Sequence, residues 1–157
     1  MPLRSVELAR RHFGGKLAGK KAALLGVTYR AGVADTRSSP AEIVARALLA
    51  EGAEVRAWDP LVPSWEEVPE VRSCRDAAEA LQGADITVVC LPDPAYRTFL
   101  PRLLVETLPA GSLVVDPWNI VADAVGAELA KKRVRLEVFG RGDFPGLENP
   151  RGGNGGT

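Results

Sequence analysis

The stretch "GVTYRAGVADTRSSPAEI", residues 26–43, decides how this chain folds. It continues the apolar run "AALLGVT" (22–28), and an unbroken apolar run of this length is typical of a buried strand in a parallel sheet. It ends in the signals of a helix start: Ser39 is a good N-cap, Pro40 suits the first helical position, and Glu42 completes a capping box. A buried strand, a loop and a capped helix in this order predict the first unit of an α/β fold.

The loop between this strand and this helix is unusual for a nucleotide-binding fold. A first strand that ends in glycine is normally followed by a G-x-G-x-x-G turn, whose backbone approaches the pyrophosphate of a dinucleotide. That motif is missing here, and a polar loop from Thr28 to Ser39 carries Arg30, Asp35 and Arg37 in its place. Without the glycine turn, the pyrophosphate of a dinucleotide has no backbone cradle.

Strands and helices alternate along the rest of the chain. Apolar runs predict six strands, over residues 21–28, 53–60, 71–74, 84–92, 112–117 and 134–140. Amphipathic segments predict five helices, over residues 3–13, 40–51, 75–83, 93–108 and 123–132. We expect Pro101 to break or kink the fourth helix, Ser73 to cap the third, and Ile43 to lie in the buried stripe of the second.

This alternation predicts a Rossmann-like fold of the α/β class. We expect a doubly wound parallel sheet of about six strands in a three-layer α/β/α arrangement. The last ten residues, 148–157, are polar and rich in glycine, and we expect them to be a disordered tail.

Composition and charge exclude several classes of function. The formal net charge is zero, so the sequence predicts no nucleic-acid partner and no anionic membrane surface. The apolar runs are far shorter than the roughly 20 residues of a membrane span, and the N-terminus has no signal-peptide core. Two cysteines, Cys74 and Cys90, lack metal-ligand spacing, which favours reduced thiols in the cytoplasm over a disulfide between them.

The candidate site lies where the strands of such a sheet end. Ligands of open parallel sheets bind at the carboxyl edge, at the point where the strand order reverses. Arg30 follows the first strand and can hold phosphate oxygens in a bidentate manner, while Tyr29 offers a flat face for a base or a sugar. The helix start at Ser39 favours a phosphate nearby. From the residues alone, a solvated loop arginine and a tyrosine packed on the sheet edge remain equally open.

Asp35 and Arg37 lie two residues apart in the same loop. An irregular loop of this length needs internal hydrogen bonds, so we expect these two side chains to pair and to fix its shape. Direct contact of either residue with a ligand is the alternative.

Other candidate residues carry weaker signals. Asp59 follows the second strand, where an acid grips the ribose of NAD, but the missing glycine turn makes a turn-forming role the preferred interpretation. His12 is expected on the surface, and Cys90 is expected to be a buried core thiol. The tripeptide at 141–143, "RGD", matches an adhesion motif at a length that arises by chance. The sequence contains no catalytic triad, no metal-ligand cluster and no paired catalytic carboxylates.

The opening loop resembles a known family. "GVTYRAGVADTRSSP" is similar to the G-x-[AS]-[FY]-K-x-x-x-x-D-x-R-x-S-P segment of the UDP-glucose/GDP-mannose dehydrogenases, which include the UDP-N-acetylmannosamine and UDP-N-acetylglucosamine 6-dehydrogenases. The similarity continues in "LLAEGAEVRAWDP", "GADITVVCLPDPAY", "LVVDPWN" and "VFGRGD", with matching order from about Leu17 to Gly142. It covers the C-terminal, UDP-binding domain of the family. The resemblance implies a connecting-helix tail over 1–16 and this domain over 17–147.

The resemblance also implies roles for individual residues. Tyr29 and Arg30 match the aromatic–lysine pair of the family, with Arg30 directed toward phosphate in place of lysine. Arg37 and Asn119 match family positions that we assign to substrate binding. Trp118 replaces an arginine that the family commonly has, which changes a phosphate or cross-subunit contact, and we assign it to substrate binding as well. Two further matches are expected to shape the loop and cap the helix: Asp35 and Ser39.

The resemblance implies that this chain binds UDP or a UDP-sugar and carries no catalytic residue and no cofactor itself. In the intact enzyme, NAD would oxidise the sugar C6 alcohol to a carboxylate. The NAD-binding domain and the central domain with the catalytic cysteine would lie outside this chain. Two alternatives remain: a free-standing nucleotide-binding or regulatory module without catalysis, and an independent NAD-binding domain.

Overall fold

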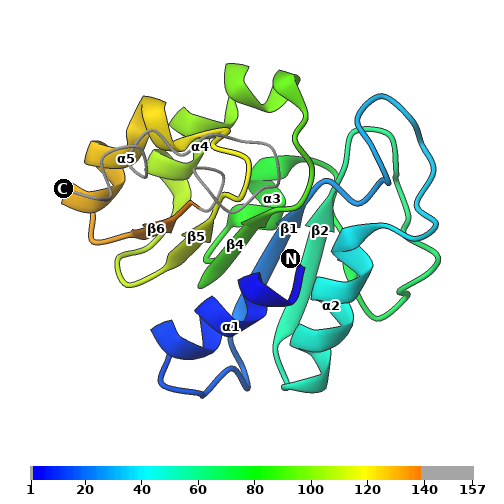
Figure 1. Ribbon diagram of the computed structural model, residues 1–157, viewed down its shortest axis with the longest axis horizontal. Helices are drawn as coiled ribbons and strands as arrows, with labels where there is room; N and C mark the ends of the chain where they lie inside the picture. The colour runs from blue at the N-terminus through cyan, green and yellow to red at the C-terminus, as the bar shows by residue number, and fades with distance from the viewer. Residues whose placement is uncertain (1, 139–157) are drawn as a thin grey trace, which may run out of the picture.

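The computed structural model describes residues 2–138, and a parallel sheet forms their centre (Figure 1). Its six strands are β1 (Lys21–Leu25), β2 (Glu54–Trp58), β3 (Arg72–Ser73), β4 (Ile86–Val89), β5 (Leu113–Val115) and β6 (Arg135–Glu137). All neighbouring pairs are parallel, in the order β3-β2-β1-β4-β5-β6. This is the strand order of the dinucleotide-binding fold, with its reversal between β1 and β4, and it confirms the predicted fold class.

Helices cover both faces of the sheet (Figure 1). They are α1 (Pro2–His12), α2 (Pro40–Ala50), α3 (Ala77–Leu81), the 3-10 helix η1 (Pro94–Thr98), α4 (Leu100–Thr107) and α5 (Ala122–Lys131). The buried residues of α1 and α2 pack into one core cluster, and those of α3, α4 and α5 pack into a second. Strand β1 contributes to both, because Ala22 and Leu24 face the first cluster while Ala23 and Leu25 face the second.

Glycine and proline interrupt elements in two places, of which the break at Pro101 was predicted. Strand β1 ends at Leu25, earlier than expected, because Gly26 turns the chain with φ +89°. Pro101 divides the predicted fourth helix, which forms η1 and then α4 with Pro101 in its first turn. A proline lacks the N–H that a helix interior requires, so the chain restarts the helix at this point.

The start of α2 differs from the prediction in two details. Ser39 is the N-cap and its Oγ accepts a hydrogen bond from the Ala41 N–H at 3.1 Å. The predicted capping box is not completed, since the Glu42 carboxylate accepts from Arg46 Nε at 2.9 Å instead. Ile43 was expected in the buried stripe and is 49% exposed. The helix is rotated so that the smaller Ala41 faces the sheet.

The cap of α3 was also assigned to the wrong residue. Asp76 is the N-cap, and its Oδ1 accepts from the Glu79 N–H at 2.7 Å. Ser73 lies at the end of β3, where its Oγ accepts from the Trp65 N–H at 3.1 Å. The serine therefore serves the loop before β3 rather than the helix after it.

Candidate functional site

Two of the loops that leave the carboxyl edge of the sheet lie side by side. Residues 26–39 follow β1 and residues 59–71 follow β2. A hydrogen bond from Thr36 Oγ1 to Glu67 Oε1 joins them, and Arg46 on α2 donates to the Glu67 carbonyl at 2.8 Å. The predicted site therefore lies on a loop with a defined position, beside the strand-order reversal where ligands of this fold bind.

Tyr29 and Arg30 are presented by a hydrogen-bonded turn. The Tyr29 N–H donates to the Asp35 carbonyl at 2.7 Å, and Thr28 Oγ1 donates to the Arg30 carbonyl at 3.0 Å. Tyr29 is 59% exposed and Arg30 is also exposed. Within residues 2–138, the Arg30 guanidinium has no hydrogen-bond or ion-pair partner. The turn thus offers a charged group that protein contacts do not occupy.

Asp35 and Arg37 form the pair that the sequence predicted. Arg37 Nε and Nη2 donate to the two carboxylate oxygens of Asp35, each at 3.0 Å, and the Arg37 N–H donates to Asp35 Oδ1 at 3.0 Å. These hydrogen bonds lower the pKa of Asp35 to about 2. A lowered pKa keeps the carboxylate ionised from neutral pH down to that value, so the pair shapes the loop over this whole range. The ligand contact assigned to Arg37 stays a prediction.

Trp118 and Asn119 lie in the loop after β5, with β4 between them and β1. At the usual strand spacing, the ends of β1 and β5 lie about 10 Å apart along the edge. Asn119 has φ +55°, and its Nδ2 donates to Asp123 Oδ2 at 3.1 Å. Asn119 Oδ1 is buried, and no residue in the described range 2–138 donates to it.

Two residues of this edge were missed by sequence reasoning. Arg97 on η1 donates to the Asn119 carbonyl at 3.0 Å, which ties the β4 and β5 loops together. Asp116 is fully buried, and its carboxylate accepts from the N–H groups of Ile120, Val121 and Ala122. The sequence signal that could have identified Asp116 is an aspartate that directly follows a strand and precedes a proline. Asp59, which precedes Pro60, shows the same pattern.

The end of β1 packs closely against the loop that follows β4. A Cβ on Gly26 would lie 2.4 Å from Leu91 Cβ and 3.2 Å from the Tyr96 hydroxyl, so the β4 loop packs directly on this glycine. Asp59 is 5% exposed, and both of its carboxylate oxygens accept backbone hydrogen bonds. The glycine and the acid that hold NAD in a dinucleotide-binding fold are both committed to internal packing.

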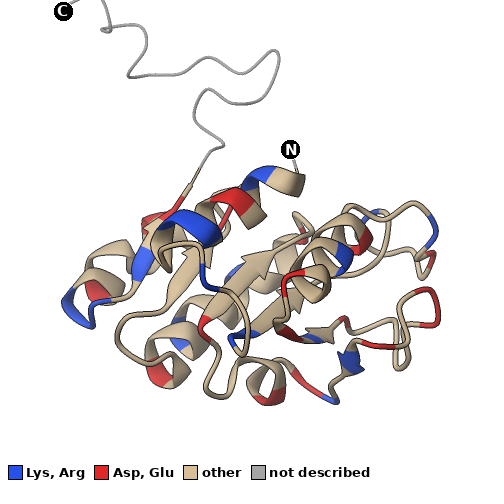
Figure 2. Ribbon diagram, turned by 90° about the horizontal axis from the view of Figure 1, so that it is seen from below, with Lys and Arg blue, Asp and Glu red and all other residues tan. Residues whose placement is uncertain are grey.

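Two open hollows adjoin the edge. One, of about 230 Å³, lies between the loops after β1 and β2 and is lined by residues that include Ala34, Thr36 and Leu61. The other, of about 390 Å³, lies at the ends of β2 and β3 and includes Trp58 and Arg75. Basic and acidic residues are interspersed over the described elements (Figure 2). The binding of an anion at this edge therefore depends on individual side chains and not on a broad positive surface.

The Tyr96 hydroxyl is buried beside this edge. Tyr96 is 1% exposed and packs against Trp58 and Phe99, and no residue in the range 2–138 hydrogen-bonds to its hydroxyl. Burial, with the nearby carboxylates of Asp59 and Asp93, raises the pKa of Tyr96. The hydroxyl is therefore neutral and removed from water, and no hydrogen bond within residues 2–138 compensates for this loss.

We expect Tyr96→Phe to raise the free energy of unfolding by about 1 kcal/mol, because the variant removes an unsatisfied buried hydroxyl and keeps the ring. Urea denaturation followed by fluorescence measures the change. Tyr29→Phe, at an exposed position, serves as the control and should leave stability unchanged. A lower stability of Tyr96→Phe would mean that the hydroxyl is satisfied.

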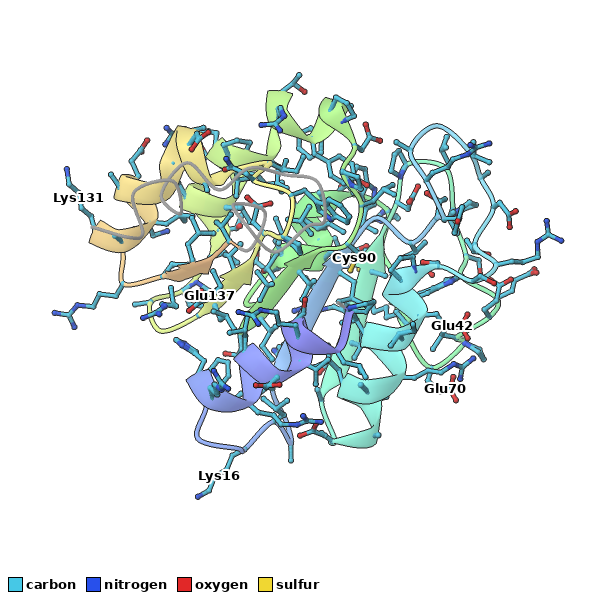
Figure 3. The ribbon with its side chains drawn as sticks, viewed as in Figure 1. Lys16, Glu42, Glu70, Cys90, Lys131 and Glu137 are labelled. Carbon is cyan, nitrogen blue, oxygen red and sulfur yellow. The ribbon has the colours of Figure 1, made fainter. Side chains whose placement is uncertain are left out.

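The remaining candidate residues are the two cysteines and His12. Both cysteines are free thiols, and Cys90 lies inside the molecule, whereas Lys16 and Lys131 point outward (Figure 3). Burial raises the pKa of Cys90 to about 12, which excludes a thiolate nucleophile at neutral pH. The exposed ring of His12 lies 2.8 Å from the Gly111 carbonyl. Residues 2–138 contain no group of three or more metal-ligating side chains, and no helix among them is long and apolar enough to cross a membrane.

Two predicted features lie outside the described residues: the tripeptide at 141–143 and the tail at 148–157.

The strand order and the polar loop at the reversal define a nucleotide-binding domain of the Rossmann type in which the loop after β1 lacks the glycine-rich turn that cradles a dinucleotide. The sequence profile of the UDP-glucose/GDP-mannose dehydrogenase family, UDP binding domain, matches residues 23–123. The chain belongs to this family, as its opening loop predicted.

Relatives and solved structures agree with this assignment. The chain is 35% identical over 123 residues to a UDP-N-acetyl-D-mannosamine dehydrogenase of Methanocaldococcus jannaschii, covering 77% of this chain and 27% of that protein. It is 34% identical over 132 residues to a UDP-glucose 6-dehydrogenase of Rhizobium meliloti, covering 83% and 29%. The fold is similar to that of a UDP-D-ManNAc dehydrogenase from Pyrococcus horikoshii, with a TM-score of 0.67, 24% identity, and coverage of 91% and 31%. The chain thus spans less than a third of each of these proteins.

Proposed function

We propose that this domain binds the UDP portion of a UDP-sugar and that Arg30 contacts its phosphate oxygens. One observation carries the proposal: an exposed guanidinium without a partner in the described range sits on a fixed turn at the strand-order reversal. The N-terminus of α2, an eleven-residue helix, follows the same loop and favours negative charge. A guanidinium remains charged at every relevant pH and matches phosphate geometry.

The other predicted site residues have supporting positions. Exposed Tyr29 is suited to stack on the base or the sugar. Arg37 keeps donors beyond those bound to Asp35, and its side chain is 81% exposed. Asn119 retains a buried acceptor, and Trp118 adjoins it in the loop after β5. We propose that these residues extend the contact from the phosphates along the carboxyl edge.

In the intact enzyme, we propose that the bound UDP-sugar is oxidised at its C6 alcohol to a carboxylate. This oxidation would require two hydride transfers to NAD, and water would supply the second carboxylate oxygen. NAD and the reactive cysteine would belong to the domains outside this chain, since the loop after β1 lacks the G-x-G-x-x-G turn and both carboxylate oxygens of Asp59 already accept backbone hydrogen bonds. The free thiols of Cys74 and Cys90 support a reducing, cytoplasmic compartment.

We expect Arg30→Ala to weaken UDP binding by about 1.5–3 kcal/mol, the scale of a hydrogen bond to a charged group. Isothermal titration calorimetry of UDP against the full chain measures this change. Arg11→Ala is the matched control, because Arg11 is an exposed arginine on α1 that pairs with Glu7. The control should bind UDP like the unaltered chain.

The same titrations separate the alternatives. Binding of NAD without UDP would identify an independent NAD-binding domain and would contradict the proposal. Unchanged UDP affinity in Arg30→Ala would remove Arg30 from the site. UDP binding that is insensitive to an attached sugar would instead favour a free-standing nucleotide-binding module.

A further inference from the structure

The carboxylate of Asp59, directly after β2, joins its own turn to the chain that leaves β1. Its Oδ2 accepts from the Val27 N–H at 2.9 Å and from the Thr28 N–H at 3.3 Å. Its Oδ1 accepts from the Leu61 N–H at 2.9 Å. With Asp59 only 5% exposed, these bonds replace the water that the charge would otherwise require. The end of β2 therefore fixes the backbone that leaves β1.

This contact continues directly into the turn that carries Arg30. Thr28 donates its N–H to Asp59, and its hydroxyl Oγ1 donates to the Arg30 carbonyl at 3.0 Å. Between them, the Tyr29 N–H donates to the Asp35 carbonyl at 2.7 Å. The N–H groups of residues 27–29 and the Arg30 carbonyl therefore each have a hydrogen-bond partner. The position of Arg30 is thus set by a chain of hydrogen bonds that begins at a buried carboxylate on the neighbouring strand.

We infer that Asp59 is a positioning residue for phosphate binding: it holds the 27–30 backbone so that Arg30 is presented before the nucleotide arrives. The inference rests on the proposed function, because that function makes this turn the anion site. A turn that is already ordered loses less conformational entropy when a ligand binds. Asp59 itself has little capacity for a direct ligand contact, since both oxygens already accept from the backbone.

Asp59→Asn tests this inference with little change in volume. The amide nitrogen cannot accept a hydrogen bond, so the variant loses the contact to Val27 and Thr28 or the contact to Leu61. We expect UDP affinity, measured by calorimetry on the full chain, to fall roughly tenfold, which corresponds to the lower limit for a charge-assisted hydrogen bond. Backbone amide exchange followed by NMR should become faster at Thr28 and Tyr29 while β1 stays protected.

Asp85→Asn is the matched control. Asp85 Oδ2 accepts from the Lys21 N–H at 2.9 Å, so it makes the same kind of contact at the opposite end of β1. We expect this variant to lose stability and to retain its UDP affinity. If both variants lose affinity in proportion to stability, Asp59 has only a structural role and the inference is overturned.

A double variant separates positioning from folding. If Asp59 acts through Arg30, Asp59→Asn in an Arg30→Ala background should weaken UDP binding far less than tenfold. An equal loss in both backgrounds would contradict the inference, as would unchanged amide exchange at residues 27–30. A full chain that binds no UDP at all would overturn the proposed function and the inference together. Normal binding by Asp59→Asn would overturn the inference alone.

Discussion

Replacing Gly26 by alanine is expected to lower the free energy of unfolding by about 3–4 kcal/mol. Two costs add up at this position. Gly26 has φ +89°, which an L-residue adopts only with strain of about 1–2 kcal/mol. The new methyl group would also lie 2.4 Å from Leu91 Cβ, and overpacking of this kind costs about 1–3 kcal/mol.

Gly111→Ala separates these two costs. Gly111 has nearly the same conformation, with φ +90°, but a Cβ there would meet no atom within 4 Å. We therefore expect this control to lose only the conformational part, about 1–2 kcal/mol. Urea denaturation of both variants gives the difference. Equal losses would mean that the β4 loop moves away from Gly26 easily, so that the close packing at Gly26 adds no cost of its own.

The close packing at Gly26 also explains which part of the site the sequence predicted. The Asp35–Arg37 pair was predictable because two opposite charges lie two residues apart in a long loop. The contact of Gly26 with Leu91 and Tyr96 joins segments that are distant in the sequence. No local pattern encodes such a contact, because it depends on the order of β1 and β4 in the folded sheet.

The fold was predictable because its signals are local. Continuous apolar runs mark β1, β4 and β5, and Ser39, Pro40 and Pro101 mark helix starts by their own backbone chemistry. Ile43 was misplaced because apolar spacing does not fix the rotation of a helix when small residues such as Ala41 can face the sheet. Local chemistry therefore identified the elements, and packing decided how they are oriented.

Asp116 is another residue whose role local sequence signals did not reveal. Helix α5 begins after Val121, whose side chain makes no capping hydrogen bond. The cap comes from five residues earlier: Asp116 Oδ1 accepts from the Ile120 N–H at 2.9 Å, and Oδ2 accepts from Val121 at 2.9 Å and from Ala122 at 3.2 Å. This carboxylate therefore fixes the loop that carries Trp118 and Asn119.

Asp116→Ala is expected to lower the free energy of unfolding by about 3–4 kcal/mol, because it leaves N–H groups in a site of zero exposure without an acceptor. Asp93→Ala is the matched control: Asp93 also precedes a proline, but it accepts from one N–H only, that of Ala95, and we expect about 1 kcal/mol there. Urea denaturation measures both losses. If Asp116→Ala costs no more than Asp93→Ala, water satisfies the N–H groups and Asp116 does not hold the loop. A large loss accompanied by weaker UDP binding would extend the site to the loop after β5, because Asn119 depends on this carboxylate for its position.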